Sequence, residues 1–350
     1  MNNLYMLLIV AGGLILFAVI VQGFWQSHKA SRMLRSRNSK ILGDLRNTEP
    51  SWEGAEQDAA QRPLLYDTIG LPDAEFYTSL VDPLIDEIVE IELDVPIKGD
   101  VAISATPASR RVGSKPMYFE GFNENAGLWE PFNRKEMYPR LQVALQLANR
   151  TGALNEIEFS DFIRLTQSYA DRIGGVFKVP EMAETVLRAR ELDQFAGDHD
   201  AQLRINLVSN ATAWSLSYLH QQAAELGFVA GSVPGRMVLP SAQNGAPPIL
   251  TMTFDVQAAM ADDPNMIPIT YAVLALDVPQ TDKNEEPFKL LYKISASLAK
   301  VLEASVVDEQ GMPLNAQAFD EIYKMLEGLY DQLEIRGLNA GSNAARRLFS

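Results

Sequence analysis

Apolar and polar residues recur in regular patterns over residues 201–337, and the order of these patterns predicts an α+β fold. Residues 201–209 alternate, with Leu203, Ile205 and Leu207 on one face, as in a strand that is buried on one side. Further strands are predicted at 228–239, 249–256, 269–278 and 305–308, and helices at 215–225, 287–302 and 315–336. This order predicts an antiparallel sheet with helices on one face and the other face open.

Residues 75–200 repeat that order in outline. Strands are predicted at 88–95, 116–122, 128–132, 141–148 and 176–179, and helices at 159–173 and 180–195. The stretch 98–111 leaves room for only a turn or two of helix. We interpret 75–200 and 201–337 as a degenerate tandem of one fold, with a single larger mixed domain as the alternative.

An uncharged run of twenty-two residues, Leu4–Trp25, opens the chain. At about 1.5 Å per residue it reaches roughly 33 Å as a helix, enough to cross a membrane. A cleavable signal peptide fits poorly, because no Lys or Arg precedes the run and no small-x-small site follows it. The run therefore predicts a transmembrane helix.

The flank of this run is basic and sets the expected orientation. Its cations are Lys29, Arg32, Arg35, Arg37, Lys40 and Arg46. Lys and Arg stay on the cytoplasmic side, so residues 1–3 are expected in the periplasm and the remainder in the cytoplasm. Residues 26–74 are interpreted as this flank and a flexible linker, and residues 338–350 as a flexible tail.

Charge and cysteine content narrow the classes of function. The formal net charge is −15, and because residues 1–46 carry about +5, the remainder carries about −20. Nucleic acid is therefore an unexpected partner. No cysteine is present, which removes disulfides, thiol catalysis and cysteine-based zinc sites.

Catalytic motifs are absent from the sequence. The three histidines, His28, His199 and His220, form no metal-binding pattern, and no phosphate-binding loop, dinucleotide fingerprint or Gly-x-Ser-x-Gly occurs. We therefore predict no catalytic, cofactor-binding or metal-binding residues, and favour a binding module over a membrane-bound hydrolase or transferase.

Several short stretches carry a resemblance to a known family. They are Leu276-Asp277-Val278-Pro279, Phe288-Lys289-Leu290-Leu291, Leu298-Ala299, Val306-Val307-Asp308-Glu309-Gln310 and Pro313-Leu314-Asn315. In these stretches, in element order and in the anchor, the chain resembles the ZipA family of bacterial division proteins, which anchor the tubulin-like FtsZ ring to the inner membrane. Residues 201–337 resemble the carboxy-terminal FtsZ-binding domain of that family.

The resemblance implies that the open sheet face binds the carboxy-terminal peptide of FtsZ in a shallow apolar groove. The residues that it places there are Gln202, Arg204, Asn206, Thr253, Asp255, Val273, Ala275 and Asp277. They are more polar than the family pattern implies. A second folded unit also stands where family members often have a long Pro/Gln-rich spacer. The position of the groove is therefore open.

The first unit offers an alternative site. Tyr118, Phe122, Trp129 and Phe132 place four aromatic side chains on two neighbouring strands, and alternation puts Tyr118 and Phe122 on one face. Aromatic side chains often anchor bound peptides, although they also fill ordinary cores. A groove between the two units is a third option.

The resemblance and the anchor together imply a non-enzymatic adaptor without cofactors. It is expected to tether, stabilise and bundle FtsZ filaments in the Z ring at the bacterial inner membrane. A membrane-tethered cytoplasmic scaffold for a different division or envelope partner is the alternative. The acidity of the cytoplasmic part would favour a basic peptide, or would only keep the protein soluble.

Overall fold

The computed structural model of the chain describes residues 79–260, 263 and 267–350. They belong to one compact unit, Phe76–Ser350. The run Leu4–Trp25, its basic flank and the linker lie outside the described residues, so the anchor remains a prediction. Within the described part of the chain, no helix is long and apolar enough to cross a membrane.

The fold is α+β with antiparallel sheets and helices, as predicted. The elements of its first part are β1 (Asp86–Lys98), α2 (Gly99–Ala105), β2 (Arg111–Val112), β3 (Lys115–Asn123), β4 (Leu128–Pro131), β5 (Met137–Gln146), β6 (Ala148–Asn149), β7 (Gly152–Ala153), α3 (Glu156–Ile173), β8 (Gly175–Phe177) and α4 (Met182–His199). Within this part, β1, β2, β3, β4, β5 and β8 form the first sheet.

The second part of the chain builds another six-stranded sheet. Its elements are β9 (Gln202–Ser209), α5 (Leu216–Glu225), β10 (Val229–Ala230), β11 (Arg236–Leu239), β12 (Leu250–Phe254), α6 (Val256–Met260), β13 (Tyr271–Asp277), the 3-10 turn η3 (Lys283–Glu285), α7 (Pro287–Val301), β14 (Ala304–Val307) and α8 (Ala316–Ile335). The last helix, α9 (Asn343–Leu348), follows.

The two sheets share a strand order. The first runs β2-β3-β5-β1-β8 and the second runs β10-β11-β12-β13-β9-β14. In the first sheet β1 lies between β5 and β8, which are the strands of that sheet before and after α3. In the second sheet β9 lies between β13 and β14, which are the strands before and after α7. These three strands thus have the same order in both sheets.

The helix boundaries follow from capping residues that are visible in the sequence. Asn155 accepts backbone hydrogen bonds at the start of α3 and forms a capping box with Glu158. Gly174 ends the same helix in the left-handed conformation, with φ of 71°. Asn315 caps α8 in the same manner, by accepting from the amide of Ala318.

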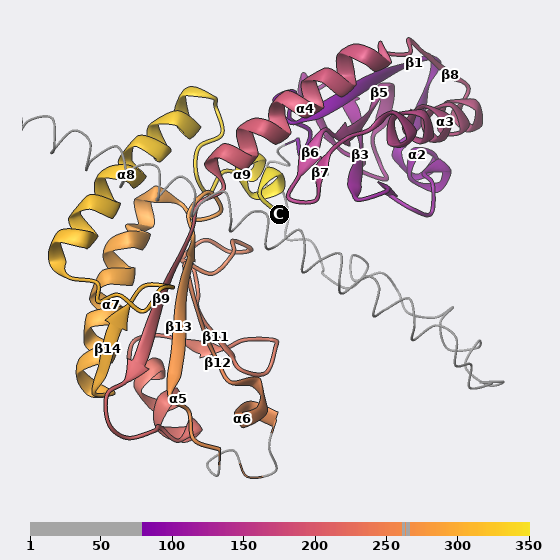
Figure 1. Cartoon of the computed structure of the whole chain (residues 1–350). Coiled ribbons are helices and arrows are strands. Elements are labelled where there is room, and N and C mark those ends of the chain that lie inside the picture. The colour runs from indigo at the N-terminus through magenta and orange to yellow at the C-terminus, as the bar shows by residue number, and fades with distance from the viewer. Residues whose placement is uncertain (1–78, 261–262, 264–266) are drawn as a thin grey trace, which may run out of the picture. The chain divides into compact units, whose positions relative to one another are not determined.

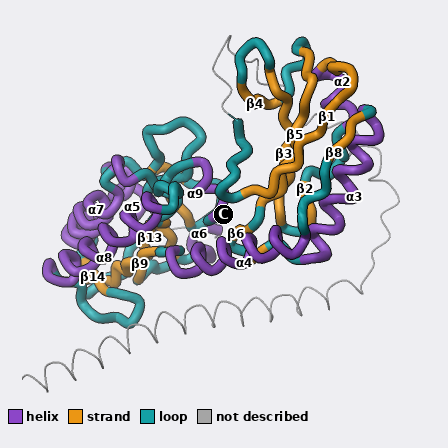
Figure 2. Tube along the Cα trace, turned by 90° about the horizontal axis from the view of Figure 1, so that it is seen from above, coloured by secondary structure: helices purple, strands orange, loops and turns teal. Residues whose placement is uncertain are grey.

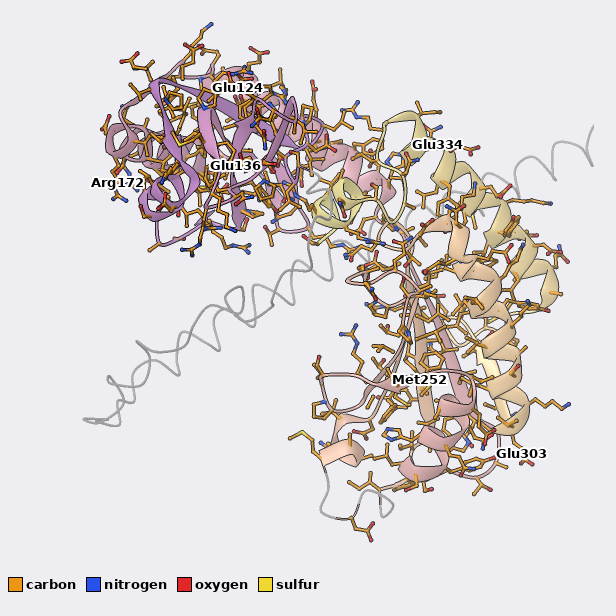
Figure 3. All side chains as sticks on the ribbon, turned by 180° about the vertical axis from the view of Figure 1, so that it is seen from behind. Glu124, Glu136, Arg172, Met252, Glu303 and Glu334 are labelled. Carbon is orange, nitrogen blue, oxygen red and sulfur yellow. The ribbon has the colours of Figure 1, made fainter. Side chains whose placement is uncertain are left out.

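Each sheet packs one face against helices. In the second sheet Met252 pairs with Leu274, which pairs with Ile205, and all three side chains are buried. Met252 is labelled on this sheet in Figure 3. Leu291 and Leu298 of α7 belong to the same buried cluster, and α7 and α8 run along this face (Figure 1).

The C-terminal residues differ from the prediction of a flexible tail for 338–350. They contain α9, and the side chains of Leu348 and Phe349 are completely buried. Both belong to the core cluster of the first sheet, and α9 lies beside β6 (Figure 2). A six-residue helix is too short to show a helical period in the sequence, which is why this segment was predicted as a tail.

Candidate functional site: the open face of the second sheet

Within residues 79–260 and 267–350, the helices pack on one face of the second sheet and leave its other face open. Side chains on this open face alternate along each strand with the buried ones. Arg204 on β9 pairs with Ala275 on β13, which pairs with Thr251 on β12. Arg204 is exposed, and Ala275 and Thr251 are half-buried. The sequence alternation therefore predicted correctly which residues of β9 point away from the core, and the residues of β13 on this face are those that the resemblance placed there.

A cavity of about 320 Å³ lies on this open face. It is lined by Gln202, Arg204, Arg236, Pro247, Pro248, Ile249, Thr251, Ala275, Leu276, Asp277 and Gln280. Its apolar lining residues are Pro247, Pro248, Ile249, Ala275 and Leu276, and the others are polar or charged. They include two arginines from different strands.

The structure brings together most of the residues that the resemblance placed in the groove. Four of them line the cavity: Gln202, Arg204, Ala275 and Asp277. Three more lie on the same face in the adjacent row of the sheet: Asn206, Val273 and Thr253. The side-chain amide of Asn206 is already used, because it donates to the carbonyl of Asp308 at 2.9 Å.

Asp255 lies elsewhere, which corrects its placement on the groove strand. Strand β12 ends at Phe254, and the Asp255 carboxylate accepts a 2.8 Å hydrogen bond from the amide of Gln257. Asp255 therefore stands at the start of α6, a short helix that was not predicted. An aspartate that bonds an amide two residues ahead favours a helix start over a continuing strand.

Asp277 is engaged inside the protein. Arg150, from the loop between β6 and β7, contacts its two carboxylate oxygens at 2.7 and 2.9 Å. The same guanidinium also pairs with Asp200. Burial raises the pKa of Asp277 above its usual value, and Arg150 partly offsets that rise. This carboxylate therefore serves to fix the edge of the cavity and is not free to bind a ligand.

Seven lining residues were not predicted. One of them, Leu276, is a buried core residue of β13. The other six are Arg236, Pro247, Pro248, Ile249, Thr251 and Gln280. Two of them carried a signal in the sequence. Thr251 alternates with Thr253 on one strand, and Arg236 faces Thr253 across the β11–β12 pair. Pro247 and Pro248 lie in a loop, Ile249 directly precedes β12, and Gln280 lies in a turn. Outside a strand, the sequence period does not predict which way a side chain points.

The corresponding face of the first sheet is partly covered by the chain itself. Glu120 on β3 is buried and accepts hydrogen bonds of 2.7 Å from the Ser79 hydroxyl and from the amide of Leu80. At the other end of this face, Arg347 of α9 pairs with the buried carboxylate of Asp86. Segments before β1 and after α8 thus occupy positions that an added peptide would need.

The four aromatic residues of the alternative site do not form one surface. The guanidinium of Arg347 lies over the ring of Tyr118, 4.1 Å from its centre, and Phe132 packs against Tyr138. Phe122 and Trp129 do meet edge to face, with ring centres 5.3 Å apart. Arg140 stacks on Phe122 at 4.1 Å. Of the four predicted aromatic side chains, Phe122 and Trp129 are thus the two with a ring contact to one another among the described residues, and both are half-buried.

Fold and cavity together define an α+β domain with an open antiparallel sheet suited to binding a peptide. Residues 256–325 match the family model described as "ZipA, C-terminal FtsZ-binding domain". The resemblance to ZipA is thereby confirmed, and the protein is ZipA-like over this region. The matched family is a binding domain and not an enzyme family. The matched residues include β13, which contributes Ala275 and Asp277 to the cavity.

Comparison with other proteins adds little to this match. No curated protein matches the chain. Among solved structures, one titled "Structure of FgChi7B" is 10% identical and has a TM-score of 0.19. The alignment covers 74% of this chain and 55% of that one. A similarity this slight indicates neither a shared fold nor a shared function.

Proposed function

We propose that this protein is a non-enzymatic, membrane-anchored adaptor that binds the C-terminal peptide of FtsZ. The peptide would lie on the open face of the second sheet, over the cavity between Arg204 and Arg236. The predicted helix at 4–25 would hold the protein at the bacterial inner membrane, with residues 26–350 in the cytoplasm. In this way the protein would tether FtsZ filaments in the Z ring and bundle them.

The family match carries this proposal, because it falls on the strand at the centre of the open face. The cavity supports it, since four residues implied by the resemblance line it. The covered face of the first sheet also favours the second sheet as the peptide site. A filament displays many tails, so weak single sites would gain about 100- to 10,000-fold in avidity at a membrane surface.

Replacing Ala275 with glutamate is expected to weaken binding of a labelled FtsZ C-terminal peptide about tenfold or more. The new carboxylate would stand on the cavity floor, where a bound peptide would strip it of water, and about 1.4 kcal/mol of such a cost is tenfold in affinity. Fluorescence anisotropy with the compact unit, residues 76–350, measures the effect.

The matched control is Ala296→Glu, the same change at an exposed position of α7, which packs on the other face of this sheet and does not line the cavity. It should leave the affinity within about twofold, as a surface change distant from the site. FtsZ that lacks its C-terminal peptide should lose binding to the unaltered protein. Equal binding by the truncated FtsZ would refute a peptide groove.

Deleting residues 4–25 is expected to abolish recruitment of the full-length protein to membranes. About 20 apolar residues are needed to span the hydrocarbon core, and no other uncharged run of that length exists in the sequence. Flotation with liposomes of bacterial lipid measures recruitment. Deleting residues 51–72, an equal length of the predicted linker, should leave flotation unchanged. Equal flotation of both variants would contradict the anchor.

We also propose that the first sheet and its helices are a degenerate copy of the ZipA-like domain. The shared strand order supports this, with β1, β5 and β8 placed as β9, β13 and β14 are. In this copy the peptide face would have been taken over by the residues around Ser79 and by α9.

A membrane-tethered scaffold for another cytoplasmic partner is the second candidate. The polar side chains of Gln202, Arg204 and Asn206 favour it, since they differ from the apolar groove that the resemblance implies. Affinity capture with the full-length protein would favour this alternative if it returned a different division or envelope protein and no FtsZ.

A further inference from the structure

The cavity on the open face is locally cationic, although the whole chain is acidic. Arg204 and Arg236 are both exposed and both line it. Neither guanidinium has an ion-pair partner within the part of the chain that the structure describes. The acidic residue of the lining, Asp277, shares Arg150 with Asp200, so this cluster of three side chains carries one net negative charge. Together with Arg204 and Arg236 the side chains around the cavity still carry a net charge of +1, in a protein whose formal charge is −15.

The sheet register fixes the distance between the backbone positions of these two arginines. Arg236 lies on β11 and Arg204 on β9, which are three strand spacings apart in the order β11-β12-β13-β9. Arg236 is opposite Thr253, which lies in the same cross-strand row as Asn206. Asn206 is two residues from Arg204 on β9, so the two arginines are also offset by two residues along the strands. With about 4.8 Å between strands and about 3.4 Å per residue, the two backbone positions are about 16 Å apart.

The surface between the two arginines is small and apolar. Ala275 on β13 and Thr251 on β12 lie opposite one another, on the two strands between those of the arginines. Pro247, Pro248 and Ile249 also line the cavity. No charged side chain of the described residues interrupts this floor. It therefore fits compact apolar side chains, with a carboxylate at either end.

We propose that this cavity binds an extended peptide with two carboxylates four residues apart and small apolar residues between them. An extended chain advances about 3.3 Å per residue and alternates its side chains between two faces, so residues four apart lie about 13 Å apart on one face. The long arginine side chains can cover the remainder of the roughly 16 Å between the two arginine backbone positions. Arginine suits this role because its planar fork binds carboxylates in a bidentate manner. The inference rests on the proposed function, because it takes the open face as a peptide site. It predicts an acidic peptide, whereas the net charge of the chain favoured a basic one.

The test uses a fluorescein-labelled peptide with an amidated C-terminus, Glu-Val-Ala-Val-Glu, and its twin in which glutamine replaces both glutamates. Binding to residues 76–350 is measured by anisotropy at low salt, alongside the FtsZ C-terminal peptide. We expect the Glu peptide to bind about fivefold or more tightly than the Gln peptide, and the difference to shrink as salt is added.

Charge reversal assigns the effect to the two arginines. Arg204→Glu and Arg236→Glu should each weaken binding of the Glu peptide by about fivefold, and neither should weaken binding of the Gln peptide. Arg110→Glu makes the same change at an exposed arginine before β2 and should alter the affinity less than about twofold. Circular dichroism confirms that each variant is folded.

The outcomes separate this inference from the proposed function. Equal binding of the Glu and Gln peptides, absence of binding by the Glu peptide, or indifference to both reversals would overturn the inference, whatever FtsZ does. Binding of the Glu peptide with these responses, but no binding of the FtsZ peptide, would uphold the inference and refute the proposed function.

Discussion

Replacing Arg347 with alanine is expected to lower the free energy of unfolding by about 3–5 kcal/mol. The Arg347 guanidinium pairs with both carboxylate oxygens of Asp86, whose side chain is completely buried. It also donates to the carbonyl of Leu80 and stacks on Tyr118. Without Arg347 the Asp86 carboxylate would be left buried and unpaired, which is costly because the interior solvates a charge poorly. Urea unfolding of residues 76–350 at pH 7 measures the loss.

The loss should depend on pH in a defined direction. Burial raises the pKa of Asp86 above its usual value, and Arg347 opposes that rise. A raised folded-state pKa means that the contribution of this carboxyl to stability is fully present below its unfolded pKa and is lost as pH rises through the folded value. Removing Arg347 raises the folded pKa further. The deficit should therefore be largest near pH 7 and should shrink as the solution is acidified.

The neighbouring arginine supplies the control. Among the described residues, the Arg346 side chain donates hydrogen bonds to the side chain of Gln243 and to the carbonyl of Gln280. Arg346→Ala should cost about 1 kcal/mol or less. Equal losses for the two variants, or a deficit for Arg347→Ala that does not change with pH, would show that the Asp86 pair is not what stabilises this region.

Replacing Phe349 with alanine is expected to cost about 3–5 kcal/mol, the usual range for removing a buried phenylalanine. Its ring is completely buried in the core cluster of the first sheet, together with Leu348. Its carbonyl accepts a hydrogen bond from Gln280, which lies in the turn after β13. Thermal and urea unfolding measure the change. The backbone hydrogen bond does not depend on the ring, so the loss would report the missing packing.

The matched change is Ile335→Ala at the end of α8, where the side chain is 79% exposed. It should alter the free energy of unfolding by less than about 0.5 kcal/mol. A loss of similar size for Phe349→Ala would mean that the C-terminal residues behave as the flexible tail that the sequence suggested.

Much of the fold follows from local patterns. The alternation of Leu203, Ile205 and Leu207 identified β9 and its buried face, and the cap at Asn315 located the start of α8. These features depend only on residues that are close together in the chain, so they can be predicted from a single sequence. The open face followed for the same reason, because a side chain opposite a buried one on a strand must point away from the core.

Features that depend on distant partners were not predictable. Nothing around Phe349 indicates that its ring completes a core containing Ile85. The cavity wall at Pro247 and Pro248 belongs to a loop, whose path is set by tertiary contacts. The local positive charge of the cavity was also not predictable, because net charge is a sum over the chain. Arg204 and Arg236 are placed around one cavity only by the order of the strands.

The position of α9 in the chain has a consequence for the order of events during synthesis. Asp86 and Arg347 are 261 positions apart, and the residues that close the first core are made after the whole second sheet. At about 5–20 residues per second, the strands that begin with β1 wait on the order of 10–50 s for Leu348 and Phe349. Through that interval the part of the first core that Leu348 and Phe349 fill is open to chaperones or to other chains, although α3 and α4 can already pack on the sheet. The first of the two sheets to be made is thus the last to be completed.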